Sequence, residues 1–181
     1  MNFIEKYKIN TKLCDQFIDY HKKNKEYKLN GFIGNETGMY VDEKQKKSTD
    51  VYFFNQSKEK FIVEFFSNLS NCLIEYCNKF KISHSLHTHV SNLIQHYNPG
   101  DGYYALHYER GGGASIKREL AYMMYCNNVL NGGTEFPFQN KKLNAIKGHL
   151  YIWPAFFTHP HKGIISHKKE KYIVTGWVDV V

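Results

Sequence analysis

The stretch from Gln95 to Arg110, QHYNPGDGYYALHYER, combines a turn with a segment suited to holding a metal ion. Its turn-forming run, Asn98 to Gly102, consists of residues that favour a change of chain direction. The following residues, 103–109, include aromatic side chains that are typical of a strand. Because side chains two residues apart project from the same strand face, His107 and Glu109 could bind one metal ion together.

A third ligand is needed, because a His-x-Glu tripeptide occurs by chance in many proteins. Residues 153–163 contain two histidines, His159 and His161, and either could supply it. Two imidazoles and one carboxylate on one face of an ion, with three positions open, is the arrangement that non-haem Fe(II) oxygenases use. The sequence therefore predicts a metal site built from two distant segments.

A cation is predicted beside this site. Lys171 begins a strand-like segment, and every second residue of that segment shares its face. If the strand neighbours the one that bears His161, the ammonium would project beside the metal. The residues on the shared face are Lys171, Ile173, Thr175 and Trp177.

Length and composition favour a single folded domain over residues 1–181. At 181 residues the chain can bury a core without disulfides, and 42% hydrophobic and 16% aromatic residues are typical of a folded protein. We expect residues 1–83 to provide helical support and loops, and residues 84–181 to form a β core. No internal repeat or linker composition indicates a second domain.

The charge gives little indication of a polyanionic partner. The net charge is +7, but the lysines are spread over segments expected to be solvated, such as Lys44, Lys46 and Lys47. The only arginines are Arg110 and Arg118. Because arginine is the residue that best recognises phosphate, a chain with so few is poorly suited to bind a phosphate backbone. Binding to nucleic acid is therefore not favoured.

The cysteines and the N-terminal residues favour a soluble cytoplasmic protein. Four cysteines form no Cys-x-x-Cys pair, and we expect them to be reduced. The residues after Met1 lack the apolar core of a signal peptide, and no apolar run is long enough to span a membrane. The cysteines are Cys14, Cys72, Cys77 and Cys126.

Helices are predicted first along the chain and strands afterwards, which indicates an α+β domain. Thr11 is predicted to cap a helix that ends in the polar run 22–25, and a helix of about six turns is predicted to follow Ser57 and extend to Phe80. Residues 30–57 are expected to be loops with a short strand at 51–54. The strands expected after Ser83, suited to a sandwich or barrel, are 90–97, 103–109, 118–127, 134–138, 149–153, 158–162 and 171–180.

From Gln95 onward the chain resembles the prolyl 4-hydroxylase-like branch of the Fe(II)- and 2-oxoglutarate-dependent dioxygenases, in particular its small virus- and phage-like members. The resemblance is carried by four ordered blocks: 97–109 with Tyr97, His107 and Glu109; 124–136; Gly148 with 153–154; and His161 followed at ten residues by Lys171 and then by Trp177. It implies a double-stranded β-helix, a jelly-roll or cupin-like barrel, with N-terminal helices packed against the major sheet.

The resemblance also implies roles for particular residues. His107, Glu109 and His161 would ligate Fe(II), with Glu109 standing where the family usually has Asp. Lys171 would pair with the distal carboxylate of 2-oxoglutarate, and Thr175 or Tyr125 could donate a hydrogen bond to it. Tyr97 would lie against the cosubstrate. Trp177 would line the site or only pack the barrel. The interval to Lys171 favours His161 over His159 as the ligand.

The implied activity is hydroxylation of an unactivated C–H bond, with peptidyl proline the leading substrate. The implied reaction consumes O2 and 2-oxoglutarate, releases succinate and CO2, and uses ascorbate as a reductant. Expected partners are the cosubstrates and a peptide or protein, without a membrane. Oxidative demethylation of nucleic acid and a non-catalytic barrel that binds metal or a small ligand are the alternatives.

Overall fold

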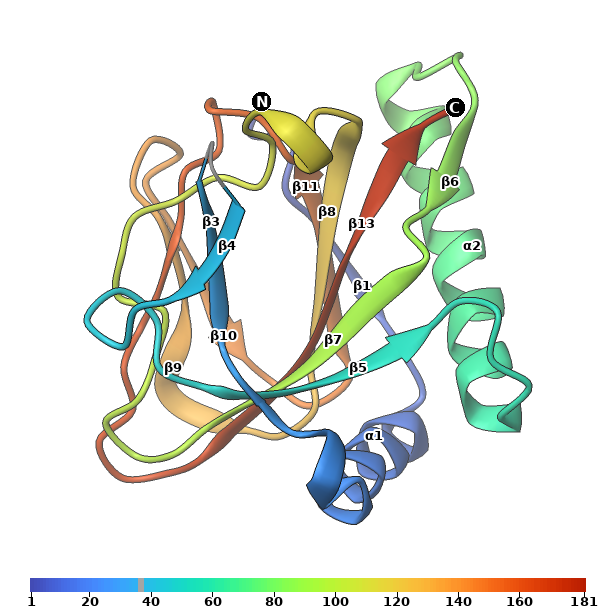
Figure 1. Ribbon diagram of the computed structural model, residues 1–181. Coiled ribbons are helices and arrows are strands. Elements are labelled where there is room, and N and C mark those ends of the chain that lie inside the picture. The colour runs from blue at the N-terminus through green and yellow to red at the C-terminus, as the bar shows by residue number, and fades with distance from the viewer. Residues whose placement is uncertain (36–37) are drawn as a thin grey trace.

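The computed structural model describes residues 1–35 and 38–181 and consists of two facing β-sheets, a hairpin and two helices. In Figure 1, α2 lies on one side of the larger sheet, and β9 and β10 lie on the other. The α+β class and the layered jelly-roll arrangement predicted from the sequence are confirmed.

The larger sheet has the strand order β1-β11-β8-β13-β7-β5-β2, and β6 pairs with β13 beyond the end of β7. All its pairings are antiparallel. The strands are β1 (Glu5–Lys8), β2 (Leu29–Asn30), β5 (Thr49–Phe54), β6 (Leu86–Thr88), β7 (Ser91–Tyr97), β8 (Arg118–Tyr125), β11 (His149–Pro154) and β13 (Lys171–Val180).

The smaller sheet has the order β10-β9-β12, and a separate hairpin, β3-β4, stands in front of it in Figure 1. Two single-turn 3-10 helices, Lys25–Tyr27 and Gly113–Ser115, lie in connections. The remaining strands are β3 (Phe32–Asn35), β4 (Gly38–Val41), β9 (Val129–Phe136), β10 (Lys141–Ala145) and β12 (Lys162–Gly163).

The helices α1 (Thr11–Lys23) and α2 (Lys60–Phe80) follow the predicted apolar periodicity. The predicted cap of α1 is wrong by one residue: the side-chain oxygen of Asn10 accepts a hydrogen bond from the amide of Lys12 at 3.1 Å, and Thr11 is the first helical residue. Asn has the short acceptor that the first amides of a helix need, and it stands one position earlier than Thr11.

Strand β8 separates two apolar cores because its side chains alternate between the faces of the larger sheet. Leu120, Tyr122 and Met124 pack with the residues of the two helices. Tyr125 and its inward-facing neighbours pack instead with Phe136 and other residues of the smaller sheet. The functional site described below lies on this second side, between the sheets.

The prediction of a regular strand over residues 103–109 is wrong. Only two isolated bridges occur there, one between Lys46 and Tyr103 and one between His107 and His161. The segment pairs with loop residues and not with a continuous strand. The alternation of side chains between two strand faces therefore does not predict where its side chains point. The strand predicted at 158–162 is likewise replaced by a turn and the short β12.

The predicted strands at 90–97, 118–127, 149–153 and 171–180 are confirmed within a few residues, and the one at 134–138 lies earlier, as part of β9. Residues 30–57 contain more strand than expected, since β5 begins at Thr49 and β2 to β4 precede it. Strands β1 and β10 were not predicted. Both carry several lysines, which obscure a strand pattern when only one face is buried.

Three of the four cysteines are buried and Cys77 is half-buried, and none forms a disulfide. Across the described residues, no helix is both long and apolar enough to cross a membrane.

Candidate active site

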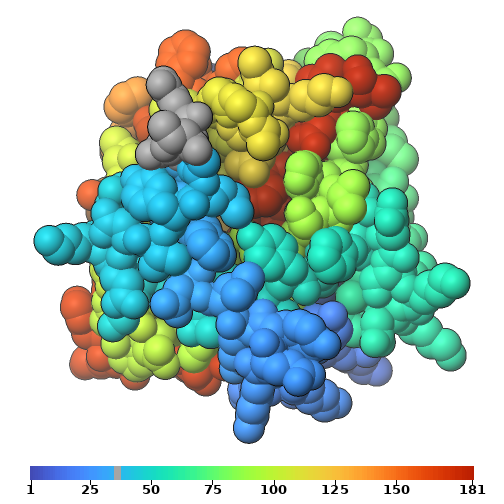
Figure 2. Space-filling model, in the orientation of Figure 1, coloured from blue at the N-terminus to red at the C-terminus, as the bar shows by residue number. Residues whose placement is uncertain are grey.

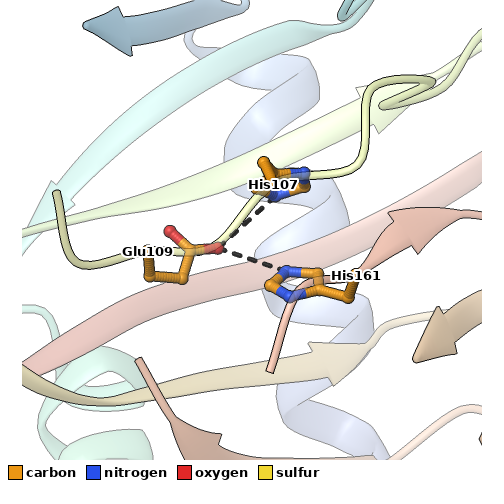
Figure 3. Close-up of side chains that lie close together, drawn as sticks. All are labelled: His107, Glu109 and His161. Atoms are coloured by element: carbon orange, nitrogen blue, oxygen red, sulfur yellow. Dashed lines mark ion pairs between the residues drawn. The ribbon is translucent and has the colours of Figure 1, made fainter. Parts of the chain in front are cut away.

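Two imidazoles and one carboxylate converge between the sheets. The candidate ligand atoms of His107, Glu109 and His161 all lie within 4.8 Å of one another. The Oε1 atom of Glu109 is 3.6 Å from Nε2 of His107 and 3.3 Å from Nε2 of His161. Figure 3 shows the carboxylate facing both rings.

Backbone pairing brings these residues together. The amide of His107 donates to the carbonyl of His161 at 3.0 Å, and the amide of His161 donates back at 2.8 Å. Glu109 is fixed separately, because its amide donates to the carbonyl of Ala155 at 3.1 Å. The convergence predicted from the sequence is present, but it arises from this bridge and not from a common strand face.

The outer ring nitrogens determine which tautomer each histidine adopts. Nδ1 of His107 lies 3.0 Å from the carbonyl oxygen of Ala105, and Nδ1 of His161 lies 3.0 Å from that of His159. A carbonyl oxygen only accepts, so each Nδ1 carries a proton, and the neutral imidazole keeps the lone pair of Nε2 available for a metal ion. This is the usual outer-sphere support of a metal-binding imidazole.

The electrostatics favour a cation between the three groups. Burial would raise the pKa of Glu109, but hydrogen bonds and charge from His107 and His161, when protonated at Nε2 and with no metal bound, outweigh burial and hold that pKa well below its usual range. Burial, followed by the nearby His161, lowers the pKa of His107, although Glu109 opposes the shift. Two lone pairs and a carboxylate facing one point fit a divalent metal ion such as Fe(II).

Aromatic rings hold the two imidazoles in place. The ring of Tyr103 stacks on His107, with centroids 3.5 Å apart and planes 9° apart. Phe136 stacks on His161 at 5.0 Å, and Trp153 meets the same ring edge-on at 5.1 Å. Neither Tyr103 nor Phe136 was predicted as a site residue, although both lie within the sequence blocks that carry the resemblance.

Of the two candidate histidines, only His161 joins the cluster. Both ring nitrogens of His159 already have partners: Nε2 lies 2.9 Å from the carbonyl of Asn2, and Nδ1 lies 2.9 Å from Oγ1 of Thr158. His159 therefore anchors the N-terminal segment rather than facing the carboxylate.

Lys171 lies in the same cavity as the cluster and is only 5% exposed. Its ammonium donates to the carbonyl of Ile164 at 3.3 Å, and no carboxylate partner occurs among the residues that the structure describes. Burial lowers the pKa of Lys171 to about 8. A buried, uncompensated cation is costly, which indicates that an anion completes this part of the site.

The expected reason for the position of Lys171 is wrong. Strand β13 pairs with β6, β7 and β8, whereas β12, which follows His161, pairs with β9. The ammonium thus reaches the site across the interior between two sheets.

The other four predicted site residues line the same cavity, which has a volume of about 700 Å³. The hydroxyl of Tyr97 donates to Oε1 of Gln95 at 2.7 Å, and that of Tyr125 lies 2.7 Å from Oγ1 of Thr134. Thr175 lies on the same face of β13 as Lys171. Trp177 does more than pack, because its indole Nε1 donates to Oε2 of Glu109 at 2.8 Å.

A buried ion pair on the cavity wall was missed. Lys46, expected to be solvated, is 3% exposed and lies 2.8 Å from Oδ2 of Asp50. Ser48 and Gln95 donate to the same carboxylate, at 2.8 and 3.5 Å. The ammonium also lies 5.7 Å from the centroid of the Tyr103 ring. A lysine within a lysine-rich stretch gives no sequence signal of burial.

The cavity opens between the β3-β4 hairpin and residues 111–115. Figure 2 shows the red C-terminal strand in a hollow beside the yellow segment, near the cyan hairpin. Large apolar side chains are exposed around this mouth, including Met39, Leu106 and Tyr108.

The chain matches one of the known protein families. Residues 93–179 match the family model described as the 2OG-Fe(II) oxygenase superfamily. A comparison with proteins of curated function finds no match.

Solved prolyl hydroxylases share the fold at low sequence identity. The viral collagen prolyl hydroxylase of Paramecium Bursaria Chlorella virus-1, solved with 2OG, is 20% identical over 99% of this chain and 97% of its own, with a TM-score of 0.74. A Pseudomonas putida prolyl-4-hydroxylase is 12% identical over 98% of this chain and 92% of its own, with a TM-score of 0.73. A Trichoplax adhaerens prolyl hydroxylase is 15% identical over 99% of this chain and 84% of its own, with a TM-score of 0.77. It was solved in complex with a hypoxia inducible factor oxygen degradation domain peptide fragment.

Proposed function

We propose that this chain is a 2OG-Fe(II) oxygenase that hydroxylates a peptidyl proline, using O2 and 2-oxoglutarate and releasing succinate and CO2; the match of residues 93–179 to that superfamily and the fold shared with prolyl hydroxylases support the proposal. The observation that carries the proposal is the pairing, in one cavity, of a His-Glu-His cluster with the uncompensated ammonium of Lys171. A 2-oxo dicarboxylic acid has one end that can chelate a metal held by the His-Glu-His cluster. Its other end is a carboxylate that can pair with the ammonium of Lys171.

Each side chain has a distinct task in this proposal. His107, Glu109 and His161 would hold Fe(II), which together with the 2-oxo acid supplies the oxidising chemistry. Lys171 binds and orients the distal carboxylate through a charge-assisted pair. Tyr97, whose ring lies 5.1 Å from the Lys171 ammonium, packs against the cosubstrate chain and excludes water. Ascorbate would serve as the reductant that keeps the iron ferrous.

A peptide substrate is supported by the cavity mouth. Its exposed apolar residues, Met39, Leu106 and Tyr108, can cover an extended segment that carries an uncharged ring into the cavity. The Trichoplax adhaerens prolyl hydroxylase, which has the same fold, is in complex with a peptide fragment, and this supports the proposal. Together these features favour a peptide over a small free substrate.

The test is incubation of the protein with Fe(II), 2-oxoglutarate, ascorbate and a panel of proline-containing peptides. We expect succinate to form and one peptide to gain the mass of one oxygen atom, with fragmentation placing the gain on proline. The matched control is the same peptide with alanine in place of that proline. Oxygen gain on the alanine peptide would contradict the proline assignment, and absence of succinate with every peptide would contradict the peptide assignment.

A further inference from the structure

The two carboxylate oxygens of Glu109 have different surroundings. Oε1 faces the imidazoles, at 3.3 Å from Nε2 of His161 and 3.6 Å from Nε2 of His107. Oε2 instead accepts the indole N–H of Trp177 at 2.8 Å. The side chain is thus held in one orientation, with a single oxygen directed at the metal position.

Arg118 completes this arrangement from the other side. Its guanidinium stacks on Trp177, with Cζ 3.6 Å from the ring centroid. Its Nη1 donates to the backbone carbonyl of Glu109 at 3.0 Å and lies 3.9 Å from Oε2. The register between β13 and β8 also suits the indole. Trp177 pairs with Ala121, and the small alanine side chain leaves space for the indole on the cavity face of β8. The indole is fixed on one face by Arg118 and at its N–H by the carboxylate.

A glutamate needs such support more than an aspartate does. It has one more rotatable bond, and fixing that bond costs conformational entropy unless hydrogen bonds already hold the side chain. On the basis of the proposed iron site, we propose that Trp177 is a positioning residue that binds Oε2 of Glu109, so that the longer carboxylate ligates the metal through Oε1 alone.

The metal affinity of a Trp177→Phe variant tests this directly. Phenylalanine keeps an aromatic face for Arg118 but removes the N–H. The matched control is Tyr76→Phe, which also removes one donor, the hydroxyl that donates to the carbonyl of Phe3, but lies in the core on the helix side and does not line the cavity. Affinity is measured anaerobically by calorimetry with Fe(II), and with Co(II) as a second probe. We expect Trp177→Phe to weaken metal binding by about 10- to 100-fold, the range for outer-sphere partners, and Tyr76→Phe to change it far less.

Two further measurements separate positioning from general packing. Since the chain has two tryptophans, Trp153→Phe leaves Trp177 as the only indole, and its fluorescence should change on metal addition. In a double-mutant cycle, Trp177→Phe should cost much less in a Glu109→Asp background, because the shorter carboxylate cannot reach both the metal and the indole. If Trp177→Phe does not fold, replacing Trp177 in the Trp153→Phe protein by benzothienylalanine removes only the N–H.

The outcomes distinguish this inference from the proposed function. Equal metal affinity in the wild type and in the variant that lacks the N–H, or full additivity in the cycle, would overturn the role of Trp177 while leaving the iron site intact. Failure of the folded wild type to bind either metal would overturn both.

Discussion

The ammonium of Lys171 lies 5.1 Å from the centroid of the Tyr97 ring, and the two residues face each other as a register pair of β13 and β7. This contact holds the cation in the cavity, where none of the described carboxylates lies within ion-pair distance of it. An anionic ligand that spans the cavity would meet it.

Replacing Lys171 by methionine removes that charge and keeps the aliphatic chain. A charge-assisted pair with a buried carboxylate contributes about 2–3 kcal/mol, so the 2-oxoglutarate dissociation constant should rise by roughly 30- to 150-fold. Calorimetry in the presence of metal measures it. Lys171→Arg serves as the charge-preserving control and should retain more affinity; an unchanged constant in Lys171→Met would refute the assigned role.

The affinity for 2-oxoglutarate should depend on pH through the same group. Burial lowers the pKa of Lys171 to about 8, so the free protein carries the ammonium below this value and loses it above. The dicarboxylate prefers the charged form. Affinity should therefore be nearly constant below about pH 8 and fall as the pH rises further, with proton uptake on binding. Lys171→Met should abolish this dependence; the same decline in that variant would assign it to another group.

The choice between the two histidines can be tested with a pair of variants. His161→Ala should remove metal binding, because it deletes one of the two imidazoles that face Glu109. His159→Ala should retain metal binding and lose about 1–2 kcal/mol of stability, since it removes hydrogen bonds to Asn2 and Thr158. Anaerobic calorimetry and thermal melts measure both effects. The reverse pattern would make His159 the ligand.

The buried pair of Lys46 and Asp50 should control stability. Asp50→Ala leaves a lysine side chain that is 3% exposed without its charge partner, and breaking a buried pair in this way costs about 3–5 kcal/mol. The double variant Lys46→Met/Asp50→Ala should recover part of that loss, because no buried charge remains. Urea unfolding measures both. A loss in the double variant as large as the sum of the single losses would contradict this account.

The sequence was informative where periodicity and spacing match a regular element. Strand β13 is predicted to the residue, and both helices follow their apolar stripes. The face shared by Lys171, Thr175 and Trp177 follows directly from strand alternation, and all three line the cavity.

It was less informative where distant segments determine the geometry. The backbone pair of His107 and His161 is an isolated bridge, which no local pattern indicates. The burial of Lys46 depends on Asp50, and the hydrogen bond from Trp177 to Glu109 depends on the packing of β13 beside β8. Such contacts depend on the tertiary fold, so residue type alone could identify these residues only as candidates.

The most direct test of the central claim, that His107, Glu109 and His161 hold iron while Lys171 binds the cosubstrate, is anaerobic absorbance spectroscopy. Fe(II) and 2-oxoglutarate are added together to the folded protein. The account predicts a visible metal-to-ligand charge-transfer band that is absent in His161→Ala and needs much more 2-oxoglutarate in Lys171→Met. A folded wild-type protein without the band, or an unchanged band in His161→Ala, would contradict it.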